Sequence, residues 1–421
     1  MAPARSTNWE EEFLTHGLSG RAQNAGVAYA GPGSGNDVPR QLRPPIAFTG
    51  GIPDPKALPI DELAAATQAV LRRDGVDALT YGGSQGYAGL RAWLAAHWTQ
   101  IEGTELTPAN YTLTIGSAHA LENVCETFLN AGDVVIVEAP SFPGSIRTIR
   151  SLGCDVESVS MDAEGLDVDE LAAKIAQVER GGRRVKLLYT IPNYHNPTGA
   201  TLSAPRRTRL LDLCEQHDIL VVEDDAYGEL GYGEPLPPSL YSLSRGRGVV
   251  KLGTFSKIIA TGLRTGWVQA TPPIIDALVA TRFDMGTSPL LLRTIAELAG
   301  GGQLEAHIEE LCLLYGRKRD LMLNELRERA GSLATWTEPD GGFFLWLKLN
   351  EAIDPVKLRR TTEEEGVAYG PGGGFFAGMM GQAAAARAPY VRLAFSYTDE
   401  ALIPEGVRRL SRALERAAEP D

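Results

Sequence analysis

The strongest constraint on the fold is an alternation of short apolar runs and helical segments between residues 111 and 270. The runs are mostly apolar and rich in β-branched residues, which is typical of strands buried on both faces of a parallel sheet. They occupy residues 112–115, 134–137, 185–189, 219–222 and 266–270, and a further run starts at Gly248. We therefore predict an α/β fold with a mostly parallel central sheet and helices on both faces.

Polar side chains follow these runs at the points where the strands are expected to end. Ser117, Asn196, Asp224 and Lys257 each lie shortly after a different run. In open parallel sheets, ligands bind at the carboxyl ends of the strands. The sequence therefore predicts a ligand site at this edge of the sheet.

Lys257 is the most informative of these residues. It ends the stretch Thr254-Phe-Ser-Lys257 after a buried run, and Arg264 follows seven residues later. A desolvated lysine amine can attack an aldehyde to form an imine, and hydroxyls with a guanidinium suit a phosphate. Together they indicate pyridoxal phosphate, although a single strand-end lysine is more often a solvated cap.

The pattern changes after residue 302. A long helix is expected at 307–329, and strands are expected at 341–347 and 390–396, which together predict a smaller α+β lobe. Near the N-terminus we expect a short helix at residues 9–14 and a Gly-rich loop or arm at 26–37.

A chain of 421 residues is too long for one simple core, so we predict two lobes. The predicted divisions are an N-terminal arm with part of the small domain (1–55), a large cofactor-binding domain (56–302) and a small C-terminal domain (303–421).

Composition excludes several classes of function. The formal net charge of −13 argues against a nucleic-acid or anionic-membrane partner, and no apolar run is long enough to cross a bilayer. The four cysteines lie far apart and the six histidines show no ligand spacing, so we expect reduced thiols, a cytoplasmic location and no metal.

Five motifs in order resemble those of fold type I pyridoxal-phosphate enzymes, specifically the class I/II aminotransferase family and its aminoadipate and kynurenine aminotransferase branch. The likeness runs from about residue 46 to about residue 396. The motifs are Tyr81-Gly-x-x-Gln-Gly, Asn196-Pro-Thr-Gly, Asp224-Asp-Ala-Tyr, Thr254-Phe-Ser-Lys with Gly262-Leu-Arg, and Val391-Arg-Leu.

The resemblance implies a role for each matching residue. Lys257 would carry the cofactor as an imine and then move the substrate α-proton. Asp224 would keep the pyridine nitrogen protonated, and Tyr227 and Asn196 would bond the phenolate oxygen of the ring. Read singly, Asp224 is more often a solvated acidic turn, and Asn196 a plain turn residue.

The remaining cofactor contacts are also implied by the resemblance. Gly116, Ser117 and Ala118 would open a helix whose amides bind the phosphate. Thr254, Ser256 and Arg264 would complete that phosphate site, and Phe142 would stack on the ring. Singly, Ser117 and Ser256 are equally helix caps, and Phe142 is equally a core residue.

Tyr81 belongs to a loop that in this family completes the site of a neighbouring subunit, so the resemblance implies a homodimer. The substrate would be bound by Arg392, Asn196 and Gly51, with Arg392 clamping the α-carboxylate through two parallel hydrogen bonds. A surface ion pair is the alternative for Arg392.

Three features depart from the family pattern. Thr261 stands where a proline is common, and Tyr194-His195 precede the Asn-Pro-Thr-Gly motif. His195 is either a second acid–base group or, more simply, a loop residue with local hydrogen bonds. The segment 26–37 does not match the arm that helps to select substrates in this branch.

The leading functional prediction is an aminotransferase that passes the α-amino group of an amino acid to a 2-oxo acid, by resemblance 2-oxoglutarate, in a ping-pong cycle. The same residues also serve a lyase, a decarboxylase or an oxidative deaminase, so these alternatives stay open. A non-catalytic regulator domain is a third alternative, although too few residues precede the matching region for a DNA-binding module.

Overall fold

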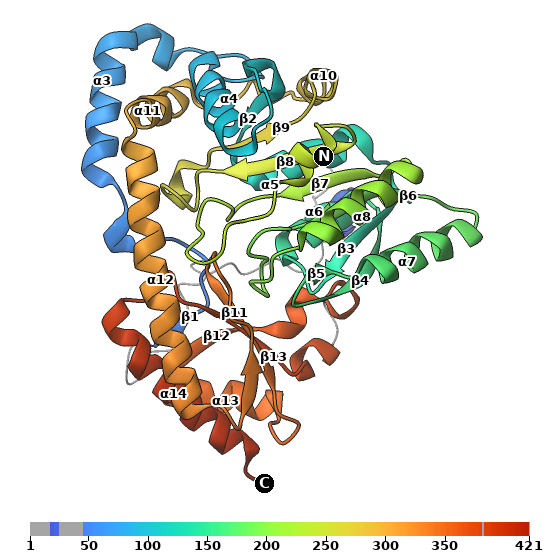
Figure 1. Ribbon diagram of the computed structural model, residues 1–421, viewed down its shortest axis with the longest axis vertical. Helices are drawn as coiled ribbons and strands as arrows, with labels where there is room; N and C mark the ends of the chain where they lie inside the picture. Colours follow the sequence, from blue (N-terminus) through green and yellow to red (C-terminus); the bar gives the residue numbers. More distant parts are fainter. Residues whose placement is uncertain (1–16, 25–44, 381–382, 421) are drawn as a thin grey trace, which may run out of the picture.

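The computed structural model describes residues 17–24, 45–380 and 383–420 (Figure 1). The helix expected at 9–14 and the loop expected at 26–37 lie outside these residues. Two sheets organise the fold, a central sheet of eight strands and a smaller sheet of five.

The central sheet is mostly parallel, as predicted. Strands β8, β7, β6, β3 and β4 are joined by parallel pairings, whereas β9 runs antiparallel to both of its neighbours, β2 and β8. Along the sheet the strands are β2 (Tyr111–Thr114), β9 (Gly266–Gln269), β8 (Val249–Thr254), β7 (Leu220–Asp224), β6 (Val185–Thr190), β3 (Val134–Ala139), β4 (Asp155–Asp162) and β5 (Gly165–Leu166).

Helices cover both faces of this sheet because the side chains on both faces of its strands are apolar. In β3, Val135 and Val137 pack with helices α5, α6 and α10, while Val134 and Ile136 join the core that contains α7 and α8. The predicted α/β class is therefore confirmed. The helices are α2 (Gly20–Asn24), α3 (Ile60–Leu79), α4 (Ala88–Glu102), α5 (Gly116–Phe128), α6 (Pro143–Ser151), α7 (Val168–Arg180), α8 (Ala204–Gln216), α9 (Leu240–Ser244), α10 (Pro272–Ala280), α11 (Pro289–Ala299), α12 (Gln303–Arg329), α13 (Pro355–Glu365) and α14 (Ile403–Ala418).

Among the described helices, we find none with the length and apolarity needed to span a membrane.

The smaller sheet has the order β1-β12-β13-β11-β10 and lies below the central sheet in Figure 1. Its first strand comes from the N-terminal part of the chain and pairs in parallel with β12. The strands are β1 (Ile46–Phe48), β12 (Val367–Pro371), β13 (Tyr390–Ala394), β11 (Phe344–Leu349) and β10 (Ala334–Trp336). The division at residues 55 and 302 stays a prediction.

Several strands differ from expectation for identifiable reasons. Strand β4 lies near the sheet edge, carries charged and polar residues, and has only Val159 fully buried, so it lacks a continuous apolar run. Strand β7 extends two residues further than predicted because its last residues, Glu223 and Asp224, are buried carboxylates. This extension places Asp224 in the strand rather than in a solvated turn.

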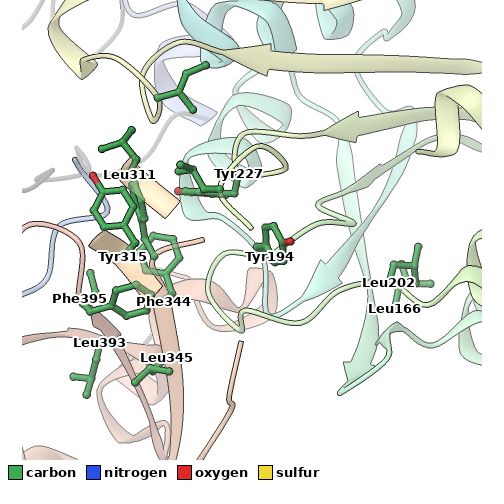
Figure 2. Close-up of a cluster of buried hydrophobic side chains, with 14 of the residues drawn as sticks. Leu166, Tyr194, Leu202, Tyr227, Leu311, Tyr315, Phe344, Leu345, Leu393 and Phe395 are labelled. Atoms are coloured by element: carbon green, nitrogen blue, oxygen red, sulfur yellow. The ribbon is translucent and has the colours of Figure 1, made fainter. Parts of the chain in front are cut away.

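A buried ion pair and an aromatic cluster connect the two sheets through helix α12. The Lys318 ammonium bonds the Asp54 carboxylate and the carbonyl oxygens of Ser396 and Thr398. The Tyr315 ring of the same helix packs edge-to-face on Phe343, just before β11, with ring centres 4.8 Å apart. Figure 2 labels Tyr315, Phe344 and Tyr227 within one cluster of buried side chains. The Tyr227 and Phe344 rings lie 5.6 Å apart in an edge-to-face arrangement.

We expect Lys318→Ala to lower the free energy of unfolding by about 3 to 5 kcal/mol, because it leaves the buried Asp54 carboxylate without its partner. Urea unfolding followed by circular dichroism measures the change. Lys348→Ala, at an exposed position of β11, is the control and should change stability by less than about 0.5 kcal/mol. Equal stability of the two variants would contradict the assignment.

Candidate active site

A cavity of about 310 Å³ lies at the carboxyl ends of the central strands, where the sequence predicted a ligand site. Every predicted cofactor or substrate residue except Tyr81 and Gly116 lines it. The lining residues are Gly51, Ile52, Ser117, Ala118, Phe142, Ile191, Asn196, Asp224, Ala226, Tyr227, Thr254, Ser256, Lys257, Thr261, Arg264, Phe344 and Arg392. The roles given to the predicted residues remain predictions.

Lys257 lies three residues beyond the end of β8, so its amine reaches into the cavity. Its Nζ donates to the carbonyl oxygen of Gly51 at 2.7 Å and lies 5.7 Å from the centre of the Tyr227 ring. Burial and the nearby charges of Arg392 and Arg264 together lower the pKa of Lys257 to about 8, although Asp224 opposes the shift. At mildly alkaline pH this amine is therefore largely neutral and nucleophilic.

Asp224 presents one oxygen that has no protein partner. Its Oδ2 accepts a hydrogen bond from the Tyr189 hydroxyl at 2.6 Å, whereas its buried Oδ1 has no hydrogen bond. Burial raises the pKa of Asp224 to about 6 against the opposing effect of the Tyr189 hydrogen bond. A buried carboxylate oxygen without a partner is costly, so this oxygen fits a protonated ligand nitrogen.

An anion site forms where three segments meet. Helix α5 begins at Gly116, whose φ of +77° suits glycine, and Ser117 and Ala118 occupy its first turn. The Arg264 guanidinium lies beside this turn and donates to the Ile115 carbonyl oxygen at 3.3 Å. The hydroxyls of Thr254 and Ser256 are 2.9 Å apart and also line the cavity. A helix start with a guanidinium and hydroxyls fits a phosphate.

Arg392 reaches the cavity from β13 of the small sheet. Its Nη1 donates to Asn196 Oδ1 at 2.9 Å and its Nη2 to the Thr49 carbonyl oxygen at 2.6 Å. The rings of Phe344 and Phe375 flank its guanidinium, with centres 4.4 and 4.9 Å from Cζ. Because the Asn196 oxygen already accepts from Arg392, the Asn196 amide nitrogen is the group that can donate into the cavity.

His195 does not line the cavity. Its Nε2 lies 3.0 Å from Glu138 Oε2 and its Nδ1 lies 3.0 Å from Thr198 Oγ1, and the side chain is fully buried. Glu138 also accepts from the Thr190 hydroxyl and the Ile191 amide. These contacts favour the interpretation that His195 makes local hydrogen bonds, and they hold the loop that carries Asn196.

Sequence reasoning missed several residues of the site. Tyr189 was read only as part of a strand, and Phe344 only as part of a core strand, although both contact predicted site residues. Ile52, Ile191 and Ala226 carry no chemical signal because their only role is to form the cavity wall. The hydroxyl of Tyr189 at the end of an otherwise aliphatic run was the one signal available.

Tyr81 lies away from the cavity of its own chain. Tyr81 is 83% exposed. Large apolar residues on the nearby 281–287 segment are also exposed, and Phe283 among them is 91% exposed. The two segments meet, since a Cβ on Gly286 would lie 2.3 Å from the Gly83 carbonyl oxygen.

Known proteins resemble this chain over nearly its whole length. The family model for aminotransferase class I and II matches residues 49–410. The aromatic-amino-acid aminotransferase 1 of Thermococcus litoralis is 36% identical over 372 residues, which cover 88% of each chain.

Two solved structures extend this likeness to the fold. The kynurenine aminotransferase of Pyrococcus horikoshii, in complex with PMP, aligns with a TM-score of 0.84 and 33% identity over 90% of this chain and 93% of its own. The α-aminoadipate aminotransferase of Thermus thermophilus, complexed with N-(5'-phosphopyridoxyl)-L-leucine, aligns with a TM-score of 0.84 and 34% identity over 96% and 98%.

We expect Asp224→Asn to stabilise the protein without added ligand at pH 8. The folded-state pKa of Asp224 is raised from 3.8 to about 6, so its ionisation disfavours folding as the pH rises through that range. The gain approaches roughly 3 kcal/mol above pH 7 and vanishes near pH 4.

Thermal unfolding of both proteins across this pH range measures the effect. Asp225→Asn is the matched control and should destabilise, because Asp225 is a partner of the buried Lys251 ammonium at 3.0 Å. An Asp224→Asn protein less stable than the parent at pH 8 would contradict the assignment.

Proposed function

The chain belongs to the class I and II aminotransferase family and is a pyridoxal phosphate-dependent aminotransferase, and we propose how its own residues carry out this reaction. One observation supports the assignment of residues above all others. A lysine amine with a lowered pKa and a buried carboxylate oxygen without a partner line the same cavity.

The residues present fit pyridoxal phosphate. The start of α5 with Thr254, Ser256 and Arg264 would hold its phosphate, and Asp224 Oδ1 would face its ring nitrogen. Asn196 and Tyr227 would donate to its phenolate oxygen. When bound, the cofactor supplies an electron-withdrawing ring that stabilises negative charge at the substrate α-carbon.

Lys257 moves the proton in this proposal. Its Nζ takes the α-proton of the substrate, which makes it an ammonium, and gives a proton back later in the reaction. The surroundings of the amine support this role, because burial and two guanidiniums keep a large share of it neutral near pH 8. Gly51, whose carbonyl oxygen accepts from Nζ, fixes where the amine lies.

Arg392 binds the α-carboxylate of the substrate. Its guanidinium is held in plane by Asn196, the Thr49 carbonyl oxygen and the flanking Phe344 and Phe375 rings. A planar guanidinium with a fixed orientation matches a carboxylate through paired hydrogen bonds. This arrangement orients the substrate α-carbon toward Lys257.

We assign the donor to amino acids with large uncharged side chains. Among the described residues that line the cavity, the cationic ones are Lys257, Arg264 and Arg392, and each already has a role. The rest of the wall includes Ile52, Ile191 and Phe344, which suit an apolar or aromatic group. The proposed acceptor, 2-oxoglutarate, rests on the resemblance to the family and not on the lining of the cavity.

A homodimer and a cytoplasmic location complete the proposal. The exposed Tyr81 and Phe283, on segments that meet, support a surface covered by a second copy of the chain, with Tyr81 reaching the phosphate of the partner's site. The four free cysteines support a reducing compartment.

The test of function is a half-reaction with protein reconstituted with pyridoxal phosphate. Adding phenylalanine, tyrosine or leucine without an oxo acid should convert the cofactor to its amine form and release the matching 2-oxo acid, detected by absorbance and mass spectrometry. Lys257→Ala should slow this conversion by about 10³-fold or more, whereas Lys348→Ala should not. Release of ammonia or carbon dioxide, with the cofactor unchanged, would refute transamination.

The dimer has its own test. Phe283→Glu should yield monomers with little activity, because it places a charge in an apolar interface. Tyr81→Phe should stay dimeric but bind the cofactor about tenfold more weakly, through loss of one hydrogen bond to a charged phosphate. Light scattering and fluorescence titration measure the two effects, and a fully active monomeric parent protein would refute the proposal.

A further inference from the structure

A chain of three buried side chains runs from helix α6 to the cavity. Ser145 Oγ lies 2.8 Å from the Tyr189 hydroxyl, and that hydroxyl lies 2.6 Å from Asp224 Oδ2. Ser145 is 4% exposed, Tyr189 is fully buried and Asp224 is 8% exposed. Neither Ser145 nor Tyr189 lines the cavity, so neither can touch a ligand there.

The direction of these hydrogen bonds follows from chemistry. An ionised carboxylate can only accept, so the single Tyr189 proton points at Asp224, and Ser145 donates its own proton to the Tyr189 oxygen. Burial and the neighbouring Asp224 raise the pKa of Tyr189 well above its usual value, so the phenol keeps this proton. The bond engages Oδ2 and leaves Oδ1 as the oxygen directed at a ligand.

We propose that Tyr189, oriented by Ser145, is a positioning residue that keeps the Asp224 carboxylate ionised and turned so that Oδ1 meets the cofactor ring nitrogen. This inference rests on the proposed function, which puts the ring nitrogen at Asp224.

The physical consequence concerns where one proton resides. Between the Asp224 carboxyl and the ring nitrogen a single proton is shared, and a hydrogen bond to the carboxylate lowers its proton affinity. Tyr189 therefore favours the proton on the nitrogen, which is the form that withdraws electrons from the substrate. Other charges around Asp224 are those of Asp225, Lys257 and Glu138, and none of them donates a hydrogen bond to it.

The test compares Tyr189→Phe with the parent protein on two cofactors, pyridoxal phosphate and its analogue in which carbon replaces the ring nitrogen. With pyridoxal phosphate, exchange of the phenylalanine α-hydrogen for deuterium should slow about tenfold, as expected for loss of one charge-assisted hydrogen bond. With the analogue the slowing should be under twofold. Ser145→Ala should show the same selectivity with a smaller effect.

A second readout does not depend on turnover. Fluorescence quenching gives the dissociation constants of Tyr189→Phe for two ligands. The constant for pyridoxamine phosphate should rise about fivefold, whereas the constant for its analogue without the ring nitrogen should stay unchanged. Tyr111→Phe is the control, because it removes an equally buried hydroxyl that bonds Gln269 at 2.9 Å.

If Tyr189→Phe slows the exchange equally with both cofactors, Tyr189 has a purely structural role and the inference is overturned. An unchanged exchange rate with both cofactors would also overturn it. The same comparison on Asp224→Asn separates this outcome from failure of the proposed function. If Asp224→Asn also fails to distinguish the two cofactors, the ring nitrogen does not lie at Asp224 and the underlying site assignment is wrong.

Discussion

The site depends on holding an amine and a carboxylate, Lys257 and Asp224, in a place where water cannot stabilise their charges. Burial shifts both pKa values toward the neutral forms, downward for the amine and upward for the carboxyl. The protein partly offsets this cost with a few directed hydrogen bonds, from Tyr189 to the carboxylate and from Lys257 to the Gly51 carbonyl oxygen. The Oδ1 atom of Asp224 keeps no hydrogen-bond partner, and a ligand must supply one.

The strand that carries Asp224 is anchored by a second layer of buried charges. Lys251 on β8 contacts the carboxylates of Glu102 and Asp225 at 2.7 and 3.0 Å, and its ammonium lies 3.6 Å from the centre of the Trp98 ring. The neighbouring Glu223 accepts from two backbone amides at the start of α9. Such networks are costly to break once they are buried, so they hold the end of β7 in one register.

The cavity also requires the two sheets to be held together. Arg392 from the small sheet bonds Asn196 from the loop that follows β6 of the central sheet, and Lys318 of α12 bonds Asp54 just after Gly51 and Ile52 in the chain. The first link joins two residues of the cavity wall, and the second holds the segment that contains the wall residues Gly51 and Ile52. A shift of the small sheet would therefore displace the guanidinium assigned to the substrate and the carbonyl oxygen bonded to Lys257 together.

The sequence by itself determined the α/β class, the positions of most central strands and the residues with chemical character. A buried parallel strand must be largely apolar, and lysine, aspartate and arginine after such runs are conspicuous. It did not reveal strand β4, whose edge position tolerates polar residues, or the wall residues such as Ile52, which have no chemical mark. Only the tertiary structure decided that Tyr189 bonds Asp224, that His195 faces Glu138 and that Phe344 flanks Arg392. Each of these contacts joins segments far apart in the chain, and no local pattern specifies which distant side chain a buried polar atom will meet.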